Sequence, residues 1–210
     1  MGGLALPYDV EIVFAAMARW HVAWLPAPLV GVAFAVVALV LTWRPLVGRR
    51  ARDRLIGLIL AAFALWVGAV HQLRLMATFD FMAPLYGGVW LVQAAATVAL
   101  VVARPRLRFR ATGAGLGLAA LALVGYPLAV VAMRYGWPAA PLVGTAPDPT
   151  AVFTAALVAT ARGRARFALL VVPLAWAGVA ALSAVLLGFA LDGAVAAAIL
   201  AAIALACARR

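Results

Sequence analysis

The sequence predicts an all-α membrane protein: a polytopic bundle of seven transmembrane helices, preceded by an interfacial helix, in a single integral domain. Of its 210 residues, 69% are hydrophobic and 11% are charged, whereas a soluble domain has roughly 45–50% apolar and 25% charged residues. The mean hydropathy is +1.14. The apolar residues also form runs near the roughly 20 residues that cross a bilayer, and short arginine-bearing links separate these runs.

The first predicted element is an amphipathic helix over residues 9–24. Its apolar side chains recur at three- and four-residue spacing, with Asp9, Glu11 and Arg19 between them. This pattern is typical of a helix that lies in the membrane interface. Pro26 and Pro28 follow, and proline is tolerated in the first turn of a helix, so the first span begins there.

The spans are expected over residues 26–43, 55–73, 83–103, 112–133, 149–161, 167–187 and 192–207. The fifth of these spans is the weakest. Its apolar run, Ala151–Ala161, is too short to cross a bilayer alone, and Pro147 and Pro149 interrupt the residues before this run. The alternative is a protein with six spans in which this segment is re-entrant.

The arginines favour the model with seven spans. Four groups hold 14 of the 17 arginines: residues 44–54, 104–110, 162–166 and the pair Arg209 and Arg210. If the fifth segment crosses, all four groups lie on one side, and the positive-inside rule makes that side cytoplasmic. The expected topology is N-terminus out and C-terminus in, in a bacterial cytoplasmic membrane. The expected cytoplasmic anchors are Arg49, Arg50, Arg52, Arg106, Arg108 and Arg164, and the acids expected outside are Asp9, Glu11, Asp80, Asp148 and Asp192.

Composition excludes several functions. The net charge is +11, but the arginines lie beside apolar runs, where anionic lipid explains them, so the expected partners are the bilayer and other membrane proteins rather than nucleic acid. The chain contains no lysine, which excludes retinal bound as a Schiff base. No catalytic motif is present, so we expect no enzyme and no cofactor.

Polar residues at the predicted outer side form one candidate site. His71, Gln72 and Asp148 would line the mouth of a solute path, and His21, His71 and Asp148 are weak candidates for a metal site. The alternative is that these residues only anchor the protein at the membrane interface. In that case Arg74 forms an ion pair with Asp80, Arg134 forms one with Asp148, and the histidines contact lipid headgroups.

A second group of polar residues lies within the predicted spans. Gln93 and Thr97 are four residues apart and share one face of a helix, and Thr154 and Ser183 are candidates to meet them. These residues would line a hydrophilic path. The alternative is that they form interhelical hydrogen bonds.

The stretch from Gly144 to Thr154 carries the most specific local pattern. Asp148 before Pro149 suits a helix start, where a carboxylate caps free N–H groups. An interrupted segment of this kind also binds solutes in transporters, so Asp148, Thr150 and Thr154 are candidate solute contacts. Capping is the alternative. A related heptapeptide, Ala27–Ala33, matches Ala140–Ala146 at six of seven positions and suggests an internal repeat.

Two shorter motifs accompany the stretch from Gly144 to Thr154: W-x-G at Trp66 and Gly68, and Y-P at Tyr126 and Pro127. Together the motifs resemble the pattern of an uncharacterised bacterial family of multi-pass membrane proteins, catalogued as domain of unknown function 6064. The third motif, G-x-A-P-C-P-T-x-x-F-T, matches the stretch from Gly144 to Thr154 except at Asp148, where the family has cysteine. The resemblance implies a helical membrane fold and no known activity.

Two functions remain open. The first is a small-solute or ion transporter, or a channel-like protein, with a polar site near the third and fifth spans. The second is an accessory or structural subunit of a membrane complex, which would pack through small residues such as Gly113 and Gly117 of a GxxxG motif.

Overall fold

The computed structural model describes residues 10–44, 46–104 and 106–208. This part of the chain is helical, and its extended segments meet only at an isolated bridge between Arg108 and Arg162. The all-α prediction is therefore confirmed, while Asp9, Arg209 and Arg210 lie outside the described residues. The helices are α1 (Val10–Ala23), α2 (Ala27–Trp43), α3 (Arg49–Trp66), η1 (Val67–Leu75), η2 (Met76–Thr78), α4 (Ala83–Thr97), η3 (Val98–Ala103), α5 (Gly113–Ala120), η4 (Leu121–Gly125), α6 (Tyr126–Ala132), η5 (Trp137–Ala139), α7 (Pro147–Thr160), α8 (Ala165–Leu169), α9 (Val171–Leu186) and α10 (Ala190–Ala208).

Five continuous helical stretches in the described chain are long and apolar enough to cross a membrane. A bent pair, α1 and α2, makes a sixth when it is counted as one span, and its two helices meet at 90°. The five stretches are Arg49–Thr78, Ala83–Ala103, Gly113–Ala132, Ala165–Leu186 and Ala190–Ala208.

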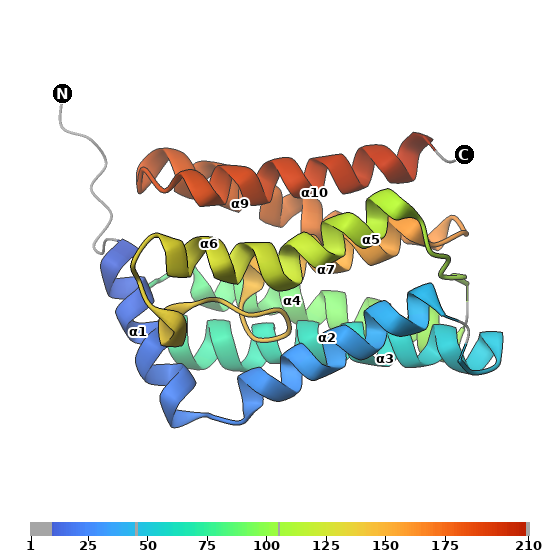
Figure 1. Cartoon of the computed structure of the whole chain (residues 1–210), viewed down its shortest axis with the longest axis horizontal. Coiled ribbons are helices and arrows are strands. Elements are labelled where there is room, and N and C mark those ends of the chain that lie inside the picture. The colour runs from blue at the N-terminus through green and yellow to red at the C-terminus, as the bar shows by residue number, and fades with distance from the viewer. Residues whose placement is uncertain (1–9, 45, 105, 209–210) are drawn as a thin grey trace.

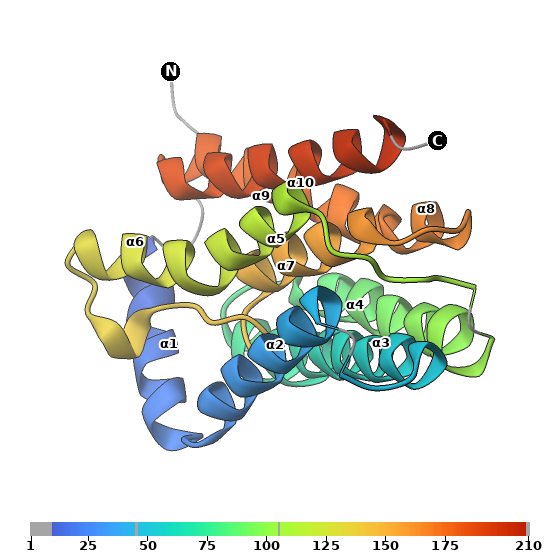
Figure 2. The ribbon, with the colours of Figure 1, turned by 45° about the vertical axis from the view of Figure 1, so that its right-hand side comes forward.

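The long helices run side by side, and α1 lies across one end of the bundle (Figure 1). In both views α9 and α10 form one side of the molecule, α2, α3 and α4 form the other, and α5 to α7 lie between them (Figure 2). The break between α1 and α2 falls at Trp24 to Pro26, because proline removes the N–H that would continue the first helix.

The central helix is α7. Every residue from 139 to 161 is buried except the half-buried Asp148. The segment packs against α5, α9 and α10. Residues 140–146 are not helical, and Gly144 contacts Phe63, which lies near the middle of the long helix Arg49–Thr78. The helical part of this segment therefore begins inside the bundle and covers only part of its length.

Three arginine-bearing links meet at the opposite end of the bundle from α1, which we call the arginine end. Arg52 donates a hydrogen bond to the Phe109 carbonyl at 2.7 Å. The buried Asp53 carboxylate accepts from the Phe109 amide at 3.2 Å. The backbone groups of Arg108 and Arg162 pair at 3.1 and 2.9 Å. The arginine groups of residues 44–54, 104–110 and 162–166 thus share one end of the molecule.

Candidate functional site

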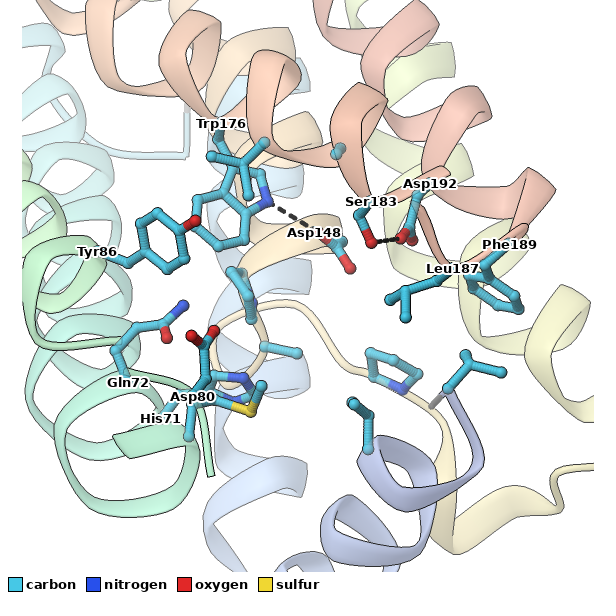
Figure 3. A pocket seen from close by; sticks show the side chains of 18 of the residues that line it. His71, Gln72, Asp80, Tyr86, Asp148, Trp176, Ser183, Leu187, Phe189 and Asp192 are labelled. Carbon is cyan, nitrogen blue, oxygen red and sulfur yellow. Dashed lines mark hydrogen bonds between the residues drawn. The ribbon is translucent and has the colours of Figure 1, made fainter. Parts of the chain in front are cut away.

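A cavity of about 290 Å³ opens at the end of the bundle that α1 covers. Its volume is near the lower limit of the roughly 300–1,000 Å³ of small-molecule sites. Its wall combines many apolar side chains with polar ones that come from several helices and loops (Figure 3). The polar and aromatic lining residues are Phe14, His71, Gln72, Asp80, Phe81, Tyr86, Tyr126, Asp148, Trp176, Ser183, Phe189 and Asp192.

The Asp148 carboxylate is held at the interior N-terminus of α7. One of its oxygens accepts from the Trp176 indole N–H at 2.8 Å and the other from the Tyr126 hydroxyl at 3.1 Å. The first turn of a helix favours a negative charge. Asp148 is therefore fixed by α6, α7 and α9 together.

Two further carboxylates line the same cavity. Asp192, at the start of α10, accepts a hydrogen bond from the Ser183 hydroxyl at 2.5 Å and lines the same cavity as Asp148. Asp80 accepts from the Met82 amide at 2.8 Å. No arginine lines the cavity, and His71 is the only basic side chain on its described wall.

His71 and Gln72 project from η1, a π-helical continuation of α3. Single π-helical turns occur frequently at functional sites. The His71 side chain is 4% exposed and lines the cavity. Gln72 is 2% exposed, and its Oε1 has no hydrogen-bond partner among the described residues. A buried carbonyl oxygen without a donor costs about 1–3 kcal/mol, so this amide is suited to a ligand donor.

Tyr86 and Trp176 form an aromatic corner in the cavity. Their rings meet edge to face, with centroids 5.6 Å apart and planes at 84°. Trp90 also meets the Trp176 ring edge to face, with ring centroids 5.8 Å apart. Trp176 also donates to Asp148, so the corner stands directly beside a carboxylate.

The helix α1 closes the cavity from the outside through Val10, Val13, Phe14 and Met17. Phe14 stacks on Tyr135 at 4.2 Å. Near the other end of α1, His21 Nδ1 hydrogen-bonds the Pro138 carbonyl at 2.8 Å. Burial lowers the pKa of the His21 imidazole, an effect that the bond to Pro138 partly offsets.

The structure separates the polar residues predicted from the sequence. His71, Gln72 and Asp148 line the cavity, whereas Gln93, Thr97, Thr150 and Thr154 are buried away from it. The Gln93 amide donates to the Leu169 carbonyl at 3.1 Å and Thr97 donates to the Gln93 carbonyl at 2.8 Å.

Several expectations for the outer polar residues are wrong in detail. Asp148 neither caps α7 nor pairs with Arg134, because its oxygens bind Trp176 and Tyr126. The side chain that closes the loop is Thr150, whose hydroxyl accepts from the Gly144 amide at 2.8 Å.

The structure shows neither the ion pair between Arg74 and Asp80 nor the metal site of His21, His71 and Asp148. Asp80 bonds a backbone amide, and Arg74 lies over the Trp24 ring at 5.9 Å, so they do not pair. Across the described residues, no three His, Cys, Asp or Glu side chains gather closely enough to hold a metal ion. His21, His71 and Asp148 therefore form no such cluster.

The predicted packing glycines face outward within this chain. A methyl group added at Gly113 or Gly117 would meet no described atom within 4 Å. The tightly packed glycine is Gly115, where the added carbon would lie 2.3 Å from Thr160 Cγ2 on α7.

Sequence reasoning missed the aromatic and hydroxyl part of the cavity. Tyr86 and Trp176 resembled ordinary apolar positions of a span, and Ser183 was assigned to a different group. Only Tyr126 had a signal, the Y-P dipeptide. Pro127 has no backbone N–H to donate to the Leu123 carbonyl. Leu123 lies in the π-helical stretch η4 (Leu121–Gly125), which ends immediately before Tyr126.

A family model, described as a family of unknown function (DUF6064), matches residues 10–210 of the chain. Comparisons with curated proteins and with solved structures gave no match.

Proposed function

The chain belongs to DUF6064, a family of unknown function, and we propose that it is a bacterial membrane protein that takes up a small solute through the cavity under α1. The observation that carries this proposal is the cavity itself. Three carboxylates, an unpartnered amide oxygen and an aromatic corner converge there, from separate helices and from the turn that holds Asp80. Such a set of polar groups within an apolar wall is typical of ligand sites.

The orientation follows from the charges. The described arginine links share one end, and the positive-inside rule places that end in the cytoplasm. The cavity then opens on the outer side of the bacterial cytoplasmic membrane. Its acids, Asp80, Asp148 and Asp192, lie on that side as well.

The buried segment 139–161, whose residues 140–146 are not helical, favours transport of the solute over binding alone. Transporters place solutes at interrupted helices whose ends lie within the bilayer. The interior start of α7 reaches the cavity through Asp148, and the rest of α7 continues to the arginine end. A movement of α7 or of the helices around it would connect the cavity with the cytoplasm.

Accessibility of one engineered cysteine tests this function. The variant Ser183→Cys, in a Cys207→Ala background, is treated with a thiol reagent carrying a trimethylammonium group that does not cross membranes. We expect labelling in spheroplasts, and slower labelling in inverted vesicles because the site is exposed alternately to both sides. Arg164→Cys should react only in inverted vesicles, and the buried Ile199→Cys in neither.

Each result has a defined meaning. Protection of Ser183→Cys in spheroplasts would overturn the outer binding site. Labelling from outside alone would leave a solute-binding protein without transport. Labelling of Arg164→Cys in spheroplasts would reverse the orientation.

A second function, that of an accessory subunit, is favoured by the open face of α5. Gly113 and Gly117 lie one helical turn apart, and a methyl group added at either would meet no described atom within 4 Å. Such faces allow close helix packing in membranes. Gly117→Leu should then dissociate a complex on native gels, whereas Gly178→Leu, at another open glycine, should not.

A further inference from the structure

We propose that the solute bound under α1 is a small organic cation, an ammonium group attached to an apolar body. This inference rests on the proposed solute site and specifies its chemistry. It combines the charge of the cavity, its aromatic corner and its unpartnered amide oxygen.

Charge gives the first argument. Asp80, Asp148 and Asp192 line the cavity without any arginine. Asp148 at the start of α7 and Asp192 at the start of α10 face this one cavity from two helices. A carboxylate offers about four lone-pair positions, and each Asp148 oxygen accepts one protein hydrogen bond. A cation between these two acids would balance their negative charge and use the lone-pair positions that the protein leaves free.

The aromatic corner gives the second argument. Tyr86 and Trp176 stand at 84° to each other, so a group in the angle between them meets two rings. Aromatic faces attract ammonium groups, and proteins use such rings to recognise quaternary ammonium ligands. The corner adjoins Asp148 through the indole N–H of Trp176.

The rest of the wall defines the body of the solute. Apolar side chains such as Met17, Met76 and Leu187 line the remaining surface, and about 290 Å³ admits only a small molecule. The buried Gln72 Oε1 lacks a donor, and a primary ammonium supplies one. A metal ion fits less well, since the described residues hold no group of three suitable ligands, and an anion would face three carboxylates.

Calorimetric titration of the purified, detergent-solubilised protein tests the inference. The probes share one ring and differ in the polar group: benzylammonium, benzyl alcohol and benzoate. We expect benzylammonium to bind most tightly, at least about tenfold better than the other two probes. Asp148→Asn and Asp192→Asn should each weaken benzylammonium binding about tenfold or more, while Glu11→Gln, an exposed acid outside the cavity, should change it less than twofold.

Two variants are used because either substitution alone can disturb folding, and a thermal melt of each variant verifies its fold. Stronger binding of benzyl alcohol or benzoate would overturn the cation but keep the proposed solute site. Unchanged benzylammonium affinity in both aspartate variants would also overturn it. Binding of none of the probes, together with labelling of Ser183→Cys from outside, would reject the cation alone; protection of that cysteine would reject the site as well.

Discussion

Gly31 of α2 and Gly144 of the loop before α7 lie against each other in the interior of the bundle. A methyl group added at Gly144 would lie 3.3 Å from Gly31 Cα, and one added at Gly31 would lie 3.1 Å from the Val143 carbonyl. The two glycines occupy the same position in the heptapeptides Ala27–Ala33 and Ala140–Ala146. The first heptapeptide is helical and the second is not, so near-identical sequences take different conformations in contact with each other.

Gly144→Ala should destabilise the protein strongly. Gly144 has a φ of +88°, and the added carbon would lie 2.7 Å from the Phe63 ring. A positive φ costs an L-residue roughly 1–2 kcal/mol and overpacking typically about 1–3 kcal/mol. We expect a loss of about 2–4 kcal/mol in the free energy of unfolding, measured by denaturation in mixed micelles.

Gly178→Ala is the matched control for this substitution. Gly178 lies in α9 with open space around it, and alanine is the better helix former by about 1 kcal/mol. Its variant should be as stable as the wild type or slightly more so. Equal stability of the Gly144 and Gly178 variants would show that the loop is not packed as described.

Asp148→Ala should destabilise the protein by removing one acceptor from two buried donors. Trp176 Nε1 and the Tyr126 hydroxyl would each lose their partner, at about 1–3 kcal/mol for each unpaired group. Tyr126→Phe should cost less, because it leaves the bond from Trp176. A double-mutant cycle of Asp148→Ala and Tyr126→Phe should be non-additive by at least about 0.5 kcal/mol; strict additivity would contradict the observed bond.

The helices could be predicted from the sequence because their signals are local. Apolar runs, prolines near helix starts and arginine links all act within one or two turns. The helix from Ala83 to Ala103 in the structure coincides with a predicted range for this reason. The five long helices are observed, while the count of seven spans stays a prediction that depends on α2 and α7.

The cavity could not be predicted in full, because it depends on contacts between distant segments. Trp176 and Tyr126 are ordinary aromatic residues until α7 brings Asp148 to both of them. Likewise, Gln93 seemed a candidate for the path because polar residues in spans are often functional. Only the fold shows that its amide reaches the Leu169 carbonyl.

Gln93→Leu should therefore lower stability but not binding, and Gln72→Leu should lower binding but not stability. Gln93 loses an interhelical hydrogen bond, which costs about 0.6–2 kcal/mol in membrane proteins, and the affinity for benzylammonium should stay within twofold. Gln72→Leu removes a cavity oxygen that has no partner, so stability should hold while the affinity falls severalfold. Melting curves and calorimetry on the same preparations separate the two cases, and a reversed outcome would place Gln93 in the site.

Acidification should weaken the packing of α1 against the bundle, because it protonates His21, a buried residue of this helix. Burial lowers the pKa of His21 below its ordinary 6.5, so the folded state favours the neutral imidazole. The stabilisation is present above pH 6.5 and is lost as the pH falls below that value toward the lowered pKa. Hydrogen exchange of the α1 amides, corrected for the intrinsic rate, should therefore increase between pH 7 and pH 5. His21→Asn keeps a donor for the Pro138 carbonyl without a titrating group, so its exchange should vary much less with pH; an equal increase in both proteins would assign the effect to another group.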